Sequence, residues 1–381
     1  MIIPFNKPLI AKSQYKYLRK AINLKKWSGD GEFTLACQKL LQDNYNFRKV
    51  LLTTSCTDAL ELASILIETC PGDEIIVPSF TFVSTVNPFL LRGAKIIFAD
   101  SQNNHPNINI NKIESLITKK TKAIVAVHYG GVSCDMEALL KITKKYGLYL
   151  IEDAAQAIDS YYLDKPLGGI GHLGVISFHD TKNIGCGEGG ALIINDQKFI
   201  TRAEILREKG TNRSAFFRGE IDKYGWVDIG SSFLPSDLLA SILLSQLETV
   251  GKVTKKRKLI WGRYNSNLIK VKKILSDLIQ LPIISQKENH NAHIYYVVCK
   301  NMAIRTQLIN FMKAQDVSLA FHYQSLSESE YAKKNGLFKK LDYSKKFSDC
   351  LVRLPLYYDL KLSEVDHICK LLIAFIKTLK K

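Results

Sequence analysis

The chain has 381 residues, and its 46% hydrophobic and 23% charged content is that of a globular protein, which excludes a disordered or fibrous polypeptide. A chain of this length is too long for one ordinary core, so we expect two domains. Its 53 lysines and arginines outnumber its 36 aspartates and glutamates, giving a formal net charge of +17. That charge suits nucleic acid, an anionic membrane face or a small anionic ligand, but the lysines form no dense basic stripe interleaved with aromatics. We therefore attribute the excess positive charge to lysines on solvated faces of helices.

The eight cysteines are spread singly along the chain, and no two of them form a CxxC pair. This pattern argues against a zinc site and against thioredoxin-type redox chemistry, so we expect reduced thiols and no metal. The N-terminus shows no basic region followed by a long apolar stretch, and no window reaches the roughly 18 apolar residues of a membrane span. We therefore expect a cytoplasmic protein that binds neither a membrane nor nucleic acid.

In chain order, an extended lead and a basic helix over 13–25 run into a glycine-rich turn at 27–31, and an amphipathic helix follows over 35–48. A short β-type run from Val50 then passes through Ser55-Cys56-Thr57 into an apolar helix with a period of about 3.6 residues. Free N–H groups at a helix start, together with hydroxyl groups, can bind an anion. Serine and threonine are also ordinary helix caps, so the turn alone does not decide between the two roles.

Strands and helices alternate from residue 50 to residue 195, which predicts a mostly parallel sheet with helices on both faces, an α/β fold. The expected elements after the first helix are a strand at 71–77, a helix opening in 78–87, a strand at 92–100, a helix at 111–120, a strand at 123–131 and a helix at 134–146. No GxGxxG follows the first strand, so a dinucleotide cofactor is disfavoured. His128 ends a buried strand, where a histidine with satisfied hydrogen bonds is a commoner outcome than a substrate ligand.

Two polar groups stand out in residues 146–194. Asp153 ends a buried strand, and open α/β sheets bind their ligands at the carboxyl ends of their strands. Lys182 lies between two apolar runs, where desolvation would lower its pKa and make its amine a carbonyl nucleophile. Such a pair suits pyridoxal phosphate, which attaches to a lysine through its aldehyde and needs an acid beside its ring nitrogen. A capping aspartate and a solvated loop lysine remain the alternative on these residues alone.

The rest of the chain predicts a long helix from residue 197, a polar loop at 210–225 and a helix through residue 247. A basic helical connector over 252–279 should then lead into a smaller α+β unit. Its expected elements are a strand at 292–299, a helix at 304–314, a strand at 318–322 and a closing helix from residue 363. We expect a large cofactor-binding domain over 1–250, including the N-terminal lead, and a small C-terminal domain over 251–381 with the connecting helix.

The segments Ile151-Glu-Asp-Ala-Ala-Gln156 and Ser177-Phe-His-Asp-Thr-Lys-Asn183 resemble the signature of the DegT/DnrJ/EryC1/StrS family. Its members are fold-type-I, pyridoxal-phosphate-dependent aminotransferases acting on nucleotide-linked keto sugars, with a large domain and a smaller α+β domain. The resemblance runs from Ile3 to Leu356. The run 207–219 also resembles the branch that uses L-glutamate to aminate C4 of a dTDP-linked 4-keto-6-deoxyhexose. The product implied is a dTDP-4-amino-4,6-dideoxyhexose, of galactose configuration, for surface polysaccharides such as enterobacterial common antigen.

The resemblance also implies roles for single residues. Lys182 would hold the aldehyde of pyridoxal 5′-phosphate and act catalytically, and Asp153 would face the ring nitrogen. Phe82 would stack on the ring, and Gln156 would hold its phenolic oxygen. The residues implied for the phosphate group are Ser55, Cys56, Thr57 and Ser177.

Loops corresponding to 210–225 approach the active site of a neighbouring subunit in the family, which implies a homodimer with shared active sites. The turn at 27–31 corresponds to one near the substrate. Ser232 and Phe233 stand where relatives often have asparagine and tyrosine. Ser325 and Ser327 stand where they typically have proline and histidine, in a loop that borders the substrate. These departures leave the exact sugar open.

Amination at C3 instead of C4 stays open as an alternative. A dehydratase is disfavoured, because the dehydratases of the family carry histidine where Lys182 stands. The alternative from another class is a non-catalytic basic protein that binds RNA or a membrane surface.

Overall fold

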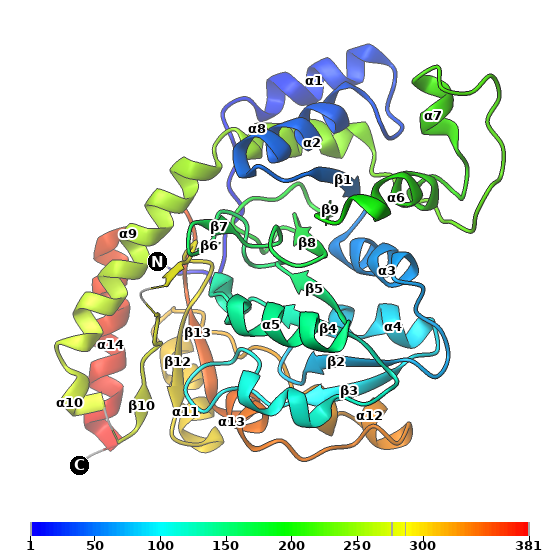
Figure 1. The fold of residues 1–381 in the computed structure, drawn as a ribbon. Coiled ribbons are helices and arrows are strands. Elements are labelled where there is room, and N and C mark those ends of the chain that lie inside the picture. The colour runs from blue at the N-terminus through cyan, green and yellow to red at the C-terminus, as the bar shows by residue number, and fades with distance from the viewer. Residues whose placement is uncertain (1, 276, 286, 380–381) are drawn as a thin grey trace.

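The computed structural model describes residues 2–275, 277–285 and 287–379. Its centre is a sheet built from β1 (Lys49–Thr53), β2 (Glu74–Pro78), β3 (Lys95–Ala99), β4 (Thr121–Val127), β5 (Tyr149–Asp153), β8 (Leu173–Ser177) and β9 (Gly190–Ile194). These seven strands lie in the order β1-β9-β8-β5-β4-β2-β3, with helices packed around them (Figure 1). The strands from β8 to β3 pair in parallel, and β9 is antiparallel to both of its neighbours. The predicted α/β fold with a mostly parallel mixed sheet is confirmed.

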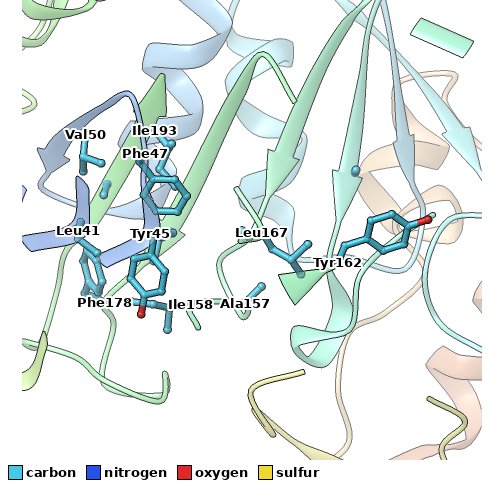
Figure 2. Packing of buried hydrophobic residues seen from close by; sticks show 14 of the residues in the cluster. Leu41, Tyr45, Phe47, Val50, Ala157, Ile158, Tyr162, Leu167, Phe178 and Ile193 are labelled. Carbon is cyan, nitrogen blue, oxygen red and sulfur yellow. The ribbon is translucent and has the colours of Figure 1, made fainter. Parts of the chain in front are cut away.

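Both faces of this sheet are buried, which explains why its strands are continuous apolar runs. Along β1, Val50 and Leu52 pack in one apolar cluster and Leu51 packs in another. The first cluster includes residues of α2 (Glu32–Tyr45), α5 (Met136–Tyr146) and α8 (Asp237–Leu247). The second includes residues of α3 (Cys56–Leu66), α4 (Asn87–Leu91) and α6 (Ile200–Arg207). Figure 2 shows part of the first cluster, in which the rings of Tyr45 and Phe47 stack with centroids 5.4 Å apart.

A second sheet organises the C-terminal part of the chain. It is antiparallel and consists of β10 (Ile279–Gln280), β12 (Tyr295–Cys299) and β13 (Leu351–Leu354). Its apolar cluster draws on α9 (Val250–Ile269), α11 (Met302–Lys313) and α14 (Leu362–Leu379). Ile3 of the N-terminal lead packs in the same cluster. This separate core supports a division near residue 250, which we keep as a proposal.

The remaining helices and strands lie outside these two sheets. They are α1 (Gln14–Leu24), α7 (Arg213–Phe217), α10 (Lys272–Leu275), α12 (Glu330–Lys334), α13 (Asp342–Cys350), and a small sheet of β6 (Tyr161–Tyr162), β7 (Lys165–Pro166) and β11 (Glu288–Asn289). Among the described residues, no helix is long and apolar enough to cross a membrane.

Four predicted elements differ in the structure. The basic helical connector expected over 252–279 is interrupted: α9 ends at Ile269, the short α10 follows, and Ile279 begins β10. Residues 111–120 form two 3-10 turns, η2 (Ile110–Lys112) and η3 (Glu114–Leu116), in place of a helix, because the side chains of Asn109 and Ser115 bond to nearby backbone groups. The helix expected from residue 197 is shorter, because the chain turns at Lys209 and Gly210, which have φ angles of 65° and 77°. Residues 318–322 make only an isolated bridge between Ala320 and Arg353, after which the chain leaves the sheet.

Candidate active site

A cavity of about 530 Å³ opens at the carboxyl ends of β4, β5 and β8. Ligands bind at this edge in open α/β sheets. The cavity is lined by all eight residues that the sequence analysis assigned to the cofactor: Ser55, Cys56, Thr57, Phe82, Asp153, Gln156, Ser177 and Lys182. The structure thus brings together residues that lie up to 127 positions apart (182 − 55). Their individual roles remain predictions.

The turn from β1 into α3 supplies one end of the cavity. Ser55 caps the helix, and its side chain accepts a hydrogen bond of 3.0 Å from the Asp58 N–H. The Thr57 hydroxyl donates to the Ser84 hydroxyl at 2.8 Å. The first N–H groups of a helix have no partner within the helix, and the helix dipole is positive there. This turn is therefore suited to a phosphate group.

Gly190, the first residue of β9, allows this turn to pack against the sheet. A Cβ atom at Gly190 would lie 2.4 Å from the Cys56 nitrogen and 2.4 Å from the Ser55 carbonyl carbon. Both atoms belong to the backbone, so any side chain at this position would push the turn away from β9.

We expect Gly190→Ala to weaken binding of pyridoxal 5′-phosphate by displacing the Ser55–Thr57 turn, and to lower stability by about 1–3 kcal/mol through overpacking. Fluorescence titration of the apoprotein with the cofactor, together with urea unfolding, measures both effects. Gly187→Ala, three residues earlier in the loop before β9 and with open space around the glycine, is the control for the turn. Its positive φ of 94° makes some loss of stability expected there, but cofactor affinity should be retained.

Asp153 ends β5 and is only 7% exposed. One carboxylate oxygen accepts a hydrogen bond of 2.8 Å from the Thr85 hydroxyl, and the other accepts one of 3.2 Å from the Ala155 N–H. Thr85 is itself held by the Thr81 hydroxyl at 2.7 Å. These bonds fix the orientation of a carboxylate that faces the cavity.

Lys182 lies in the loop between β8 and β9, and its side chain is partly buried in the cavity wall. The next residue, Asn183, anchors the loop: it donates to the Asn291 carbonyl at 3.0 Å, and its side-chain oxygen lies 2.9 Å from His293 Nδ1. Burial lowers the pKa of Lys182, whereas Cys56 and Asp153 partly oppose that shift. A lowered pKa leaves more of the amine unprotonated and able to attack an aldehyde.

This shift predicts how covalent loading of the apoprotein depends on pH. Attachment of pyridoxal phosphate needs the neutral amine, so its rate should rise with pH and level off below the ordinary lysine pKa of 10.5. Stopped-flow absorbance of apoprotein mixed with the cofactor gives the profile. Nα-acetyl-lysine amide under the same conditions is the reference, and a midpoint equal to that of the reference would contradict the desolvated environment.

Gln156 is held between the two parts of the chain. Its side-chain oxygen accepts a hydrogen bond of 2.6 Å from the Gly130 N–H, and its amide donates to the Tyr323 hydroxyl at 2.7 Å. Phe82 is 55% exposed at the cavity, with its ring centroid 6.0 Å from that of Tyr323. A half-exposed ring at a cavity mouth is free to stack on a planar ligand.

His128 is a buried structural histidine, although it lines the cavity. Its Nε2 atom lies 3.0 Å from Glu152 Oε2, and both side chains are fully buried. Its other ring nitrogen accepts from the Cys134 N–H at 3.2 Å. Both ring nitrogens are thus satisfied, which is the interpretation that the sequence favoured.

The sequence analysis missed the cavity residues supplied by the C-terminal unit: Arg257, His293, His322, Tyr323 and Arg353. Arg257 donates to the carbonyls of Ala292 and His293 at 3.1 and 2.6 Å, and burial lowers its pKa to about 9. These residues follow no local motif. The signal available was the loop that carries Ser325 and Ser327, which the resemblance places beside the substrate and which also contains His322 and Tyr323.

Other predicted segments do not line this cavity. Ser325 and Ser327 point inward, where the Ser325 hydroxyl lies 2.8 Å from that of Ser79 and the Ser327 hydroxyl donates to the Lys339 carbonyl at 2.6 Å. The turn at 27–31 is pinned through Asp30, which accepts two hydrogen bonds of 2.6 and 2.7 Å from Arg207. Large aromatic side chains are exposed in the loop at 210–225 and directly after it: Phe217 is 67% exposed and Trp226 is 81% exposed.

The cavity fits pyridoxal phosphate on four separate observations. It has a helix-start anion site, an amine with a lowered pKa, an oriented carboxylate and an exposed aromatic ring. Gly190 in addition keeps the anion site in place.

Comparisons with known proteins agree with this site. The sequence profile described as the DegT/DnrJ/EryC1/StrS aminotransferase family matches residues 8–373. The spore coat polysaccharide biosynthesis protein SpsC of Bacillus subtilis is 28% identical over 98% of this chain and 97% of its own length. The uncharacterized protein MJ1066 of Methanocaldococcus jannaschii is 31% identical over 83% of this chain and 82% of its own length.

Among solved structures, Helicobacter pylori PseC, an aminotransferase involved in the biosynthesis of pseudoaminic acid, superposes with a TM-score of 0.90. It is 24% identical, and the match covers 99% of this chain and 100% of that one. The PLP form of the putative sugar aminotransferase Spr1654 of Streptococcus pneumoniae superposes with a TM-score of 0.89 at 24% identity, over 99% of both chains. These likenesses show the fold.

The fold and the site define a fold-type-I, pyridoxal-phosphate-dependent aminotransferase. The chain belongs to the DegT/DnrJ/EryC1/StrS aminotransferase family, a family of sugar aminotransferases whose profile it matches over nearly its whole length.

Proposed function

We propose that this enzyme transfers the amino group of L-glutamate to C4 of a nucleotide-linked 4-keto-6-deoxyhexose, with dTDP-4-keto-6-deoxyglucose as the expected acceptor. The product would be a dTDP-4-amino-4,6-dideoxyhexose of galactose configuration, as made by dTDP-4-amino-4,6-dideoxygalactose transaminase. The observation that carries the chemistry is that Lys182 and Asp153 line one cavity with the Ser55–Thr57 turn. The relatives SpsC and PseC, named for polysaccharide and pseudoaminic acid biosynthesis, support a sugar acceptor. A cytoplasmic location stays a prediction from the sequence.

When bound, pyridoxal phosphate supplies an electron sink for the carbon that exchanges its amine. Lys182 Nζ would hold the aldehyde and, once released by the amine of the donor, would take the proton from the donor's α carbon. The Asp153 carboxylate would keep the ring nitrogen protonated, because a buried carboxylate beside a pyridinium favours both charged forms.

The other residues would bind and orient. Phe82 would stack on the ring of the cofactor. The Gln156 amide would donate a hydrogen bond to the phenolic oxygen of the cofactor, in competition with the hydrogen bond that it donates to the Tyr323 hydroxyl. The hydroxyl and N–H groups of Ser55, Cys56, Thr57 and Ser177 would hold the phosphate. Net positive charge would favour approach of a diphosphate substrate.

We also propose a homodimer with shared active sites. The exposed aromatic side chains in and beside the loop at 210–225, including Phe217, Tyr224 and Trp226, support it, because a monomer rarely leaves such a group uncovered.

The test is to incubate the holoenzyme with L-glutamate and a panel of nucleotide-linked 3-keto and 4-keto sugars. Product mass reports amination, and NMR distinguishes C3 from C4 and galactose from glucose configuration. A 4-amino product of galactose configuration is expected, whereas a 3-amino product would replace the proposed regiochemistry. A colourless protein that leaves every sugar unchanged and binds oligonucleotide with a steep salt dependence would contradict the enzyme altogether.

A further inference from the structure

His293 lines the cavity from the C-terminal unit and has no role in the function proposed above. It is only 6% exposed, and two asparagines beside it, Asn183 and Asn291, are 5% and 0% exposed. These three side chains form a hydrogen-bonded group that joins the loop of Lys182 to the segment before β12. The bonds within this group determine which atom of His293 is available to a ligand.

The backbone around His293 is fixed from several sides. The Asn291 amide donates to the Gln156 carbonyl at 3.0 Å, and its oxygen accepts from the His293 N–H at 3.0 Å. Arg257 donates to the carbonyls of both Ala292 and His293. Ala292 has a φ of 52°, a left-handed conformation that an alanine keeps only where its surroundings impose it. A side chain on such a support has a defined direction.

The amide of Asn183 sets the tautomer of His293. Its nitrogen donates to the Asn291 carbonyl at 3.0 Å, and a carbonyl can only accept, so the amide has one orientation. The Asn183 oxygen therefore faces His293 Nδ1, 2.9 Å away, and it also can only accept. Nδ1 thus carries the ring proton, and Nε2 keeps a lone pair. Burial, together with nearby positive charges, lowers the pKa of His293 well below 6.5 and keeps the ring neutral.

His293 differs from the structural His128 because only one of its ring nitrogens is used. His128 has a partner at each nitrogen. Within the part of the chain that the structure describes, Nε2 of His293 has no partner, and other protein atoms do not enclose it. Since Nδ1 is held by Asn183, the ring presents Nε2 to the cavity that it lines. A lone pair directed into a cavity can accept a hydrogen bond from a ligand.

An acceptor without a proton favours one of the two substrates. Once its amine has entered the reaction, L-glutamate offers only carboxylates, which accept and do not donate. The keto sugar offers hydroxyl groups, which can donate to Nε2. Asn183 follows Lys182 directly and bonds to His293, so the ring lies on the side of the cavity that carries Lys182. The hydroxyl closest to the reacting carbonyl of a 4-keto-6-deoxyhexose is that of C3, because C5 carries a methyl group and the ring oxygen.

We propose that His293 Nε2 accepts a hydrogen bond from the C3 hydroxyl of the keto sugar, with Asn183 as a positioning residue that fixes the tautomer of His293. This inference rests on the proposed aminotransferase function and adds to it a residue that selects the acceptor. A site that receives a substrate hydroxyl discriminates against the analogue that lacks it, because its own polar group is then left unpaired.

The test measures binding of two unreactive ligands to the holoenzyme by calorimetry. One is dTDP-6-deoxyglucose, which has a hydroxyl in place of the C4 carbonyl, and the other is its 3-deoxy counterpart. Wild-type enzyme should bind the 3-deoxy ligand about 3- to 10-fold more weakly, the loss typical of one neutral hydrogen bond. In His293→Asn the new amide can still donate to Asn183 from the place of Nδ1, but it has no group at the place of Nε2. Both ligands should then bind about equally.

Two further variants separate the two nitrogens. His293→Gln, whose longer amide reaches the place of Nε2, should recover part of the difference between the ligands. Asn183→Ala, which leaves the tautomer free, should narrow that difference without abolishing it. In turnover, His293→Asn should raise the KM for the keto sugar about 3- to 10-fold, whereas the KM for L-glutamate should not change.

Wild-type enzyme that does not distinguish the two ligands would overturn the inference, whether or not the variants fold. An effect of the C3 hydroxyl that His293→Asn retains in full would overturn it as well. An equal rise in the KM values for L-glutamate and the keto sugar would mean that His293 only supports the loop of Lys182. If the ligands show the expected difference through His293 but no keto sugar is aminated, the proposed function fails and the hydroxyl site stands.

Discussion

Lys182→Arg should abolish turnover, with a loss of at least about 10⁴-fold, and remove the absorbance band of the lysine-linked cofactor. Arginine keeps a positive charge in the loop between β8 and β9, but its guanidinium is not deprotonated in proteins and cannot attack an aldehyde. It also cannot take the proton from the α carbon of the donor. Absorbance spectra of the purified variant and assays with L-glutamate and the keto sugar measure both effects.

Lys313→Arg is the matched control, because Lys313 is an exposed residue of α11 outside the cavity. It should keep both the spectrum and the rate. Full turnover by Lys182→Arg with the same substrates would refute the assignment of the nucleophile.

Asp153→Asn should lower kcat by roughly 10²- to 10³-fold while the protein stays folded and binds the cofactor. The amide oxygen can still accept from the Thr85 hydroxyl, although the bond from the Ala155 N–H is lost. What is lost is the negative charge that, in its proposed role, holds a proton on the ring nitrogen, since an opposite charge a few ångströms away shifts a pKa by about 1–3 units. Steady-state kinetics with both substrates and urea unfolding separate the catalytic effect from stability.

Thr85→Val is the companion variant, because it leaves the Asp153 charge and removes the hydroxyl that orients it. Its kcat should fall much less than that of Asp153→Asn, by about tenfold. If Asp153→Asn kept the wild-type kcat, the carboxylate would have no part in holding the ring proton.

The central parts of the fold and site could be predicted because their signals are local. A β-type run, a hydroxyl-rich turn and an apolar helix follow one another from β1 to α3, and Asp153 directly ends an apolar strand. For Lys182 the flanking apolar runs are β8 and β9, so its burial also follows from neighbouring sequence. The structure adds that these pieces meet in one cavity.

What the sequence could not predict depends on contacts between distant segments. Arg353 reaches the cavity because β13 pairs with β12, and Arg257 reaches it because it bonds to the carbonyls of Ala292 and His293. Nothing in the residues around either arginine indicates those partners. The helix predicted over 111–120 was wrong for a related reason: the apolar spacing fits a helix, but polar side chains such as Asn109 compete for the backbone groups.

Ser325 and Ser327 illustrate how a departure from a family pattern can be misjudged. The resemblance implied that the loop carrying both serines borders the substrate, and the serines themselves bond to Ser79 and Lys339 inside the protein. The residues of that loop that line the cavity are His322 and Tyr323.

Borohydride reduction of the holoenzyme, followed by peptide mass mapping, tests the central claim most directly. Reduction makes the link between lysine and cofactor permanent, so the modified peptide identifies the residue that holds the aldehyde. We predict a phosphopyridoxyl group on Lys182 alone, lost in Lys182→Arg and retained in Lys313→Arg. Stoichiometric label on another lysine, or a reduced holoenzyme with no label, would contradict the account.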